Sequence, residues 1–229
     1  ALIQKNIPLE NYPKSVMRIT IGSELNLSTF VKNAIDSGYR RAGNVMDIGE
    51  IAVRGGIVDI YSPSYNNPIR IDFFGDEVED LKFFDPLTQL TNDLVKEITI
   101  LPISEVLLND INISNFKNNY RKNFGNISTN DELFQSISEG IRYPGLEHWL
   151  SFFYPKLESI FDILDNHYFF VLDSEFDDFC NMRFDDINDY FNTRNISYLE
   201  AVKNKKILDC YKPIDSIELY LNKEELYHQ

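Results

Sequence analysis

Three arginines stand where the chain is expected to turn, and they are the residues best suited to binding a partner. Arg40 and Arg41 follow an expected helix end, and Arg54 precedes the turn residues Gly55 and Gly56. Arginine at a turn is not expected to serve the core, because charged side chains are mostly exposed. A guanidinium forms charge-assisted, often bidentate hydrogen bonds with carboxylates. Solvated arginines that bind nothing are the alternative explanation.

A second group of residues able to do chemistry is acidic. Converging carboxylate oxygens could bind a divalent cation and support hydrolysis, so a metal-dependent hydrolase is an alternative function of a different class. The carboxylates fall opposite Phe176, Phe179 and Phe184 in a helical pattern, where a solvated acidic face is the simpler explanation. The residues concerned are Asp173, Glu175, Asp177, Asp178, Asp185, Asp186 and Asp189.

Sequence motifs for other chemistry are missing. No G-x-x-x-x-G-K-[ST] phosphate loop and no G-x-S-x-G nucleophile motif occurs, so the chain is not expected to hydrolyse ATP. His148, His167 and His228 have no partner at a zinc-like interval. No cofactor is implied. With 22 basic against 36 acidic residues the net charge is −14, which disfavours direct binding of duplex DNA.

Short strands must position the arginines. Runs rich in β-branched and aromatic residues predict strands over Gly49–Val53, Ile57–Tyr61, Ile69–Phe74 and Val78–Phe84. The turn residues between them are Gly55 and Gly56, then Gly75 and Asp76, so neighbouring strands are expected to pair antiparallel. Apolar and charged residues alternate from Ile69 to Phe73, which predicts one buried face and one wet face.

Helices are expected before and after these strands. Ser28 could cap a helix that ends near Gly38 and covers the sheet. Further helical patterns occupy 115–124, 131–140 and 176–191, and strands are expected at 168–172 and 206–211. The fold class is therefore α+β: a linker over 1–14, an antiparallel-sheet module over 15–103 with a covering helix, and a helix-rich, partial α/β domain over 104–229.

Four segments between residues 38 and 89 resemble a known family: GYRR, GEIAVRGGIVDIY, PIRIDFFGDEVE and TQ. They are similar to the UvrA-interaction module shared by the excision-repair protein UvrB and the bacterial transcription-repair coupling factors. Downstream, YPGLEHWL at 143–150 resembles the coupling factors more than UvrB. Ala52, where UvrB typically has a further arginine, also departs from UvrB. A UvrA-binding fragment of UvrB remains an alternative.

The resemblance implies a partner and contact residues. Arg41 and Arg54 match positions implicated in UvrA contact, Arg40 matches by proximity, and Tyr39 or Phe74 could supply an apolar hot spot. A member of this family would recruit UvrA for transcription-coupled nucleotide excision repair. Its parent protein would be an ATP-dependent DNA translocase that meets RNA polymerase, DNA and ATP through domains outside these residues.

The location expected from the sequence is the cytoplasm. Cys180 and Cys210 provide no disulfide framework, so reduced thiols are expected. No apolar run is long enough to span a membrane, and no signal-peptide pattern or initiator Met opens the chain. We expect a soluble piece of a longer protein.

Overall fold

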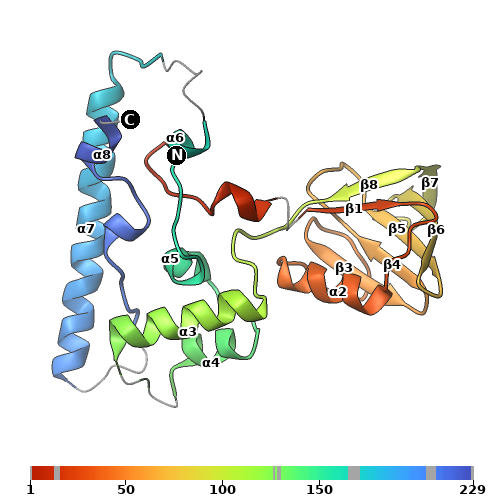
Figure 1. Ribbon diagram of the computed structural model, residues 1–229, viewed down its shortest axis with the longest axis horizontal. Coiled ribbons are helices and arrows are strands. Elements are labelled where there is room, and N and C mark those ends of the chain that lie inside the picture. The colour runs from red at the N-terminus through yellow and green to blue at the C-terminus, as the bar shows by residue number, and fades with distance from the viewer. Residues whose placement is uncertain are drawn as a thin grey trace. The chain divides into compact units, whose positions relative to one another are not determined.

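The computed structural model describes residues 2–12, 16–125, 127, 130–164, 171–204 and 210–227 of the 229-residue chain. They fall into two compact units (Figure 1). Residues 10–109 form the sheet unit, and residues 1–9 together with 110–229 form the helical unit.

The sheet unit is built on a six-stranded sheet in the order β2-β3-β4-β5-β6-β7. From β3 to β7 all neighbours are antiparallel, and β2 runs parallel to β3 at the edge. The four predicted strands are confirmed, as β3 to β6. The strands are β2 (Arg40–Arg41), β3 (Glu50–Arg54), β4 (Ile57–Ile60), β5 (Ile69–Phe74), β6 (Glu77–Phe84) and β7 (Thr91–Leu94), with β1 (Met17–Thr20) and β8 (Glu97–Ile100) as a separate antiparallel pair.

One face of the sheet packs against helix α2 (Leu27–Asp36), which confirms the covering helix. Phe30 and Ala34 of α2 are buried in one cluster with Ile51 and Ile71 of the strands. The cap differs from the prediction: the Oδ1 atom of Asn26, and not Ser28, accepts a hydrogen bond from the Thr29 backbone at 3.0 Å. Asn and Ser are equally good caps, so residue type alone could not place the helix start.

The opposite face, here called the outer face, is less exposed to solvent than the alternation of apolar and charged residues in β5 predicts. Val45, Ala52 and Phe84 are buried there as a second small core. Gln89 joins two loops over it, because its Nε2 donates to the Val45 carbonyl at 3.3 Å and to the Pro86 carbonyl at 2.6 Å. Gln89 adopts φ +61°, an uncommon conformation for a residue other than glycine. Loops therefore cover part of the expected solvent face.

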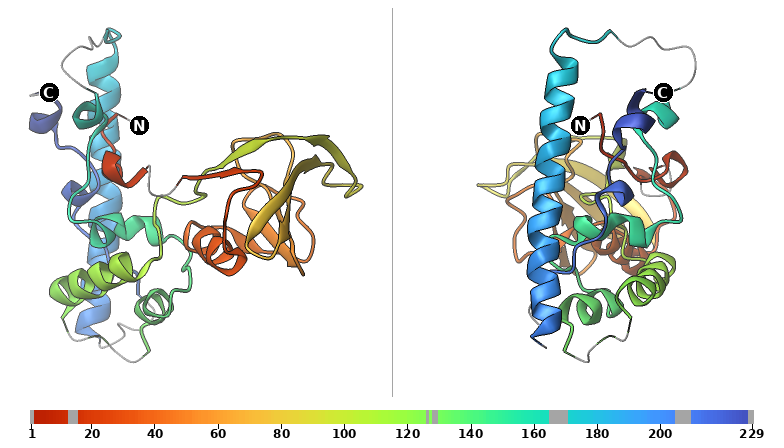
Figure 2. Two further views of the ribbon diagram at one scale, coloured as in Figure 1. Left: turned by 45° about the vertical axis from the view of Figure 1, so that its right-hand side comes forward. Right: turned by 90° about the vertical axis from the view of Figure 1, so that its left-hand side faces the viewer.

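The helical unit is held by aromatic side chains. Phe116 and Phe153 stack with ring centres 4.9 Å apart, and Tyr120 packs edge-on against Phe152. The expected helices are confirmed as α3, α4 and α7, and α7 runs past α3 at one end and α8 at the other (Figure 2). The helices are α3 (Asp110–Phe124), α4 (Glu132–Ser138), α5 (Leu150–Phe153), α6 (Ile160–Ile163), α7 (Phe176–Lys203) and α8 (Lys223–Tyr227), with short 3-10 turns η1 (Leu9–Asn11), η2 (Leu146–Trp149) and η3 (Ser216–Glu218).

Residues 2–9 belong to the helical unit, which corrects the expected linker over residues 1–14. Ile3 and Ile7 are buried. The Lys5 backbone donates to the Leu219 carbonyl at 2.9 Å, and Gln4 forms an isolated antiparallel bridge with Tyr220. Apolar residues at this end pack against a segment more than two hundred positions away, a pairing that local sequence patterns do not reveal.

Two expected strands cannot be compared fully with the structure. Residues 168–170 and 206–209 lie outside the described residues, as do His167 and His228. Val171, Leu172, Cys210 and Tyr211 are described and are not in strands. Of the helices that the structure describes, none is long and apolar enough to cross a membrane.

Candidate partner-binding surface

The hairpin of β3 and β4 fixes where Arg54 lies. Arg54 pairs with Ile57 across the two-residue turn of Gly55 and Gly56. Gly55 has φ +60°, a left-handed conformation that favours glycine. A Cβ on Gly56 would lie 2.8 Å from the carbonyl oxygen of Phe73, so the turn packs tightly against β5. One glycine provides the backbone conformation and the other allows the close approach.

Arg54 is tied into the sheet unit. Its Nη2 donates to the Gly43 carbonyl at 2.7 Å and also to Asn44 Oδ1. Its Nη1 lies 3.5 Å from Asp59 Oδ2, and 46% of the side chain remains exposed. The side chain fastens the loop before β3 to the hairpin and leaves part of the guanidinium open. Arg54 thus does not fill the core, but it has a structural role in the loop that the sequence did not predict.

Asp59 is the buried centre of a charged group on the outer face. It is 2% exposed, and its two oxygens accept hydrogen bonds from Arg70 Nε at 2.7 Å and Nη2 at 2.9 Å. The hydrogen bonds with Asp59 raise the pKa of the Arg70 guanidinium above its ordinary value. The same guanidinium lies 4.8 Å from the ring centre of Phe84. Asp59 thus positions both Arg70 and Arg54.

Arg40 and Arg41 form the edge strand β2, and the register places them on opposite faces. Arg40 pairs with Glu50, and its Nη2 lies 3.6 Å from Glu50 Oε1 on the outer face. Arg41 pairs with Ile51, whose side chain is in the core beneath α2. Both arginines are exposed. A partner that contacts both arginines would therefore have to extend over both faces of the sheet at this edge.

Glu50 holds the loop that leads into β3. Its Oε2 accepts hydrogen bonds from the backbone N–H groups of Met46 at 2.9 Å and Asp47 at 3.0 Å. These bonds, with a smaller contribution from Arg40, lower the pKa of the carboxyl below its usual value. The loop beside Arg40 and Arg54 is therefore fixed by charge-assisted bonds at both ends.

Tyr39 cannot contact a partner in this structure, which corrects its assignment as a candidate hot spot. The residue is 2% exposed, and its hydroxyl donates to the Leu101 carbonyl at 2.7 Å. Burial raises the pKa of this hydroxyl to about 12. An aromatic residue beside two arginines suits both an interface and a core, and only the packing distinguishes them.

Phe74 lies at the same end of the outer face as Arg54. Phe73 packs in the core, so its neighbour Phe74 points to the opposite face, where it is 77% exposed. Ile57, which pairs with Arg54 and Asp72, is 39% exposed on that face. An arginine and two apolar side chains therefore occur together beside the glycine turn.

The next hairpin, between β5 and β6, connects this surface to α2. Gly75 has φ +65° in the turn. Asp76 Oδ1 accepts a hydrogen bond from Asn26 Nδ2 at 2.9 Å, and the Asp76 carbonyl accepts one from the Leu25 backbone at 2.6 Å. The structure thus gives Asp76 hydrogen-bonding partners at the start of the helix.

The acidic residues near α7 are spread along and before a long helix. Among the residues that the structure describes, no three His, Cys, Asp or Glu side chains come together to hold a metal ion. Asp177 accepts a hydrogen bond from the Tyr227 hydroxyl.

Sequence reasoning missed Asp59 and Arg70 as organisers of the surface. The available signal was Asp59 itself, a charged residue within the apolar run Ile57–Ile60. A charge inside a strand of this kind is almost never buried without a partner. Its partner could not be identified, because Arg70 lies on a different strand, 11 residues along the chain.

Comparisons with known proteins show which family and which relatives the chain is similar to. Residues 17–105 match the family model of the UvrB interaction domain. The transcription-repair-coupling factor of Rickettsia bellii is 34% identical over 165 residues, which cover 72% of this chain and 15% of that protein. The factor of Haemophilus influenzae is 33% identical over 171 residues, 74% of this chain and 15% of the relative.

The factor of Rickettsia typhi is 30% identical over 221 residues, which cover 96% of this chain and 19% of the relative. The chain thus spans only 15% to 19% of the length of these relatives. The family match begins at the first residue of β1 and ends after β8, so it includes the whole sheet and α2. Residues 17–105 therefore belong to the UvrB interaction domain family, in a chain that is related to transcription-repair-coupling factors over most of its length.

Proposed function

We propose that the sheet unit is a protein-binding module that recruits UvrA during transcription-coupled nucleotide excision repair. The match of residues 17–105 to the UvrB interaction domain supports this role, as do relatives named for coupling transcription to repair. The observation that carries the proposal is the grouping of Arg54, Ile57 and Phe74 at one end of the outer face. Arginine and aromatic residues are enriched at binding hot spots.

The proposed contact residues are Arg40, Arg41, Arg54 and Phe74. Arg54 and Arg40 lie on the outer face, and Arg41 approaches the same edge from the other side. Carboxylates of UvrA would accept hydrogen bonds from the guanidinium groups. Phe74 would lose its exposure to water on binding, which contributes through the hydrophobic effect.

The wider role is part of the same proposal. We infer a binding module without catalytic activity, located in the cytoplasm. ATP, DNA and RNA polymerase would be bound by other parts of a longer translocase. A fragment of UvrB is the second candidate, and the relatives at 30% to 34% identity favour the coupling factor.

The direct test is a titration of UvrA against the 229-residue chain and its Phe74→Ala variant. Truncating a hot-spot aromatic costs about 2 kcal/mol or more of binding free energy, so affinity should fall at least about thirtyfold. The melting temperature should stay the same, because Phe74 is 77% exposed and packs little.

Ile111→Ala is the matched control, since Ile111 is an exposed apolar residue of the helical unit, 73% accessible. Its UvrA affinity should equal that of the unmodified chain. Unchanged affinity in Phe74→Ala would remove this residue from the surface, and no binding by the unmodified chain would defeat the proposed function.

A further inference from the structure

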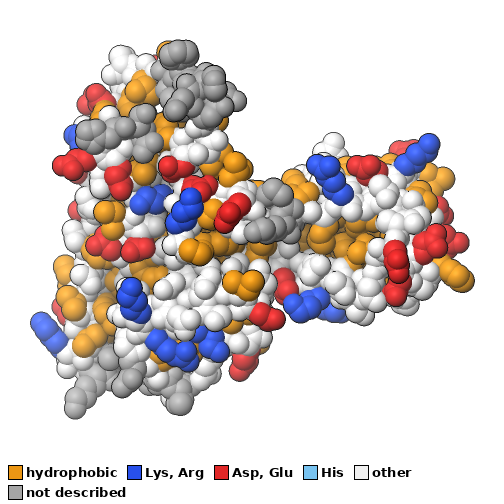
Figure 3. All heavy atoms as spheres, in the orientation of Figure 1, with side chains coloured by type: hydrophobic (Ala, Val, Ile, Leu, Met, Phe, Trp, Pro, Cys, Tyr) orange, Lys and Arg blue, Asp and Glu red, His pale blue; other side chains and the backbone are white. Residues whose placement is uncertain are grey.

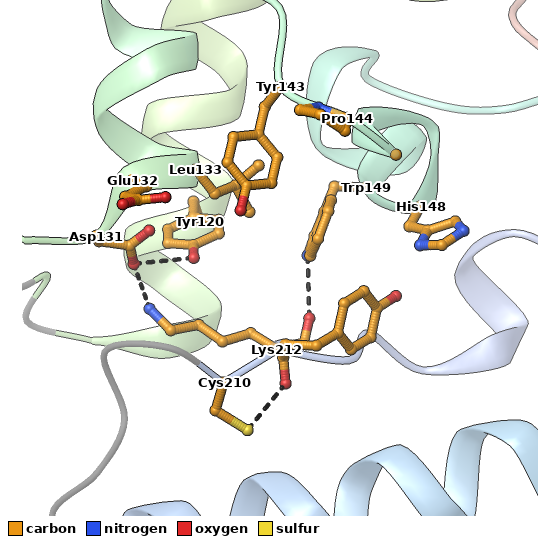
Figure 4. A pocket seen from close by; sticks show the side chains of 12 residues that line it. Tyr120, Asp131, Glu132, Leu133, Tyr143, Pro144, His148, Trp149, Cys210 and Lys212 are labelled. Carbon is orange, nitrogen blue, oxygen red and sulfur yellow. Dashed lines mark hydrogen bonds and ion pairs between the residues drawn. The ribbon is translucent and has the colours of Figure 1, made fainter.

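A separate pocket lies within the helical unit, whereas the residues assigned to partner binding belong to the sheet unit. The pocket has a volume of about 470 Å³. Pockets that bind small molecules commonly measure about 300–1,000 Å³. The side chains that matter for its chemistry are Tyr120, Asp131, Tyr143, Trp149 and Lys212 (Figure 4).

The polar side of the pocket is a buried charge pair. Lys212 Nζ forms an ion pair with Asp131 Oδ2, and both side chains are about nine-tenths buried. The Tyr120 hydroxyl donates to the same oxygen at 3.0 Å, and Asp131 Oδ1 accepts from the Phe134 backbone at 3.0 Å. Both oxygens of Asp131 are therefore already used.

Lys212 keeps donor capacity that no described residue takes up. Its ammonium group has three N–H donors, and Asp131 accepts one of them. The rings of Tyr120 and Phe124 lie 4.9 Å and 5.6 Å from Nζ. Within the described part of the chain, no other oxygen accepts a hydrogen bond from this ammonium. A ligand oxygen could accept one of the two remaining donors.

Aromatic rings form another part of the wall. Trp149 donates from Nε1 to the Lys212 carbonyl at 3.0 Å, and its ring centre lies 5.0 Å from that of Tyr211. The Tyr143 hydroxyl points toward the space between Tyr120 and Trp149 (Figure 4). Among the described residues this hydroxyl has no hydrogen-bond partner. A ligand held here would therefore face two hydrogen-bond donors, Lys212 Nζ and the Tyr143 hydroxyl.

We propose that this pocket binds an uncharged, planar aromatic molecule that carries a carbonyl group. The carbonyl oxygen accepts hydrogen bonds from Lys212 Nζ and the Tyr143 hydroxyl, and the ring packs against Trp149. The charged side chains of the pocket disfavour ionic ligands. Asp131 already offsets the charge of Lys212, and the exposed carboxylate of Glu132 also lines the pocket. A bound anion would be repelled by Glu132, and a bound cation would be repelled by Lys212.

The chain contains its own reporter of occupancy. Trp149 is the one tryptophan in the sequence, so a ¹⁵N-labelled sample gives a single indole N–H resonance from the pocket wall. The probes are benzamide, benzoate and benzamidine, which share a ring and differ in charge. Benzamide should shift the indole resonance saturably. Benzoate and benzamidine should bind at least about fivefold more weakly, since each brings a like charge toward the wall.

Two variants test the named contacts. Tyr143→Phe removes only a hydroxyl and should weaken benzamide about threefold to tenfold, the effect of one hydrogen bond. Tyr190→Phe is the matched control, because Tyr190 is exposed on α7 and does not line this pocket. The double variant Asp131→Asn with Lys212→Met removes both charges together and should bind benzamide more weakly than Tyr143→Phe.

Each other outcome would overturn the inference. No saturable shift with benzamide means that the pocket is not a site for this class of molecule. Tighter binding of benzoate or benzamidine would show that the ligand is an ion. Unchanged benzamide affinity in Tyr143→Phe would remove the proposed hydrogen bond. None of these results depends on UvrA, so the inference and the proposed function fail separately.

Discussion

Arg54 donates hydrogen bonds to the loop before β3, whereas Arg41 lies exposed in the edge strand β2. Arg41→Glu should therefore weaken UvrA binding and change the free energy of unfolding by less than about 0.5 kcal/mol. Arg54→Glu should weaken binding and also lower the melting temperature, because a glutamate loses the bonds to Gly43 and Asn44 and repels Asp59.

UvrA titrations with thermal melts of the same samples distinguish the two variants. If Arg54→Glu melts like the unmodified chain, its hydrogen bonds to the loop do not stabilise the fold. If both variants keep full affinity, neither arginine belongs to the binding surface.

Asp59 should be the most sensitive polar residue of the sheet unit. Breaking a buried ion pair by removing one partner costs about 3–5 kcal/mol, and Asp59→Asn does so for a residue bonded to Arg70 and close to Arg54. Asp72→Asn is the control, since Asp72 pairs with Lys82 at 3.0 Å in a more exposed setting and should cost no more than about 1 kcal/mol. Urea unfolding measures both. Equal effects would mean that burial of Asp59 has little energetic consequence.

At the scale of the element, the β3–β4 turn needs its two glycines for different reasons. Gly55→Asn should cost less than about 1 kcal/mol, because asparagine tolerates φ near +60° and nothing lies within 4 Å of a Cβ there. Gly56→Ala should destabilise the fold more, because the new methyl group would lie 2.8 Å from the Phe73 carbonyl and β5 would have to move. Chemical unfolding of both variants gives the order, and the reverse order would contradict this account.

Elements were predictable where a local pattern determines them. β3 to β6 follow from β-branched runs between turn residues, and α7 from the spacing of Phe176, Phe179 and Phe184. The candidate site was less predictable. Its glycines and exposed arginines have local sequence signals, but the residues that hold them in place do not. The Asp59–Arg70 pair, the buried hydroxyl of Tyr39 and the loop closed by Gln89 all depend on residues distant in sequence.

For the whole molecule, the net charge disfavours duplex DNA as a direct partner. The chain carries −14, and in Figure 3 basic side chains occur in small groups among acidic ones on the face shown. Binding to duplex DNA needs several phosphate contacts from lysine and arginine. The purified 229-residue chain should therefore show no duplex binding in a gel-shift assay. Because its sequence contains no phosphate loop, it should also show no turnover of ATP. Measurable ATP hydrolysis would contradict the assignment as a binding module.

The helical unit is interrupted in sequence by the sheet unit, and this interruption bears on the order of folding. The bond from the Lys5 backbone to the Leu219 carbonyl closes a loop that contains the whole sheet unit. Closing a long flexible loop costs conformational entropy, and that cost is smaller when the ends of the inserted part are already together. β1 and β8 bring them together, since Met17 lies opposite Ile100. During synthesis the sheet unit can therefore fold before Leu219 has left the ribosome, and the helical unit completes its pairing of residues 2–9 with the C-terminal segment last.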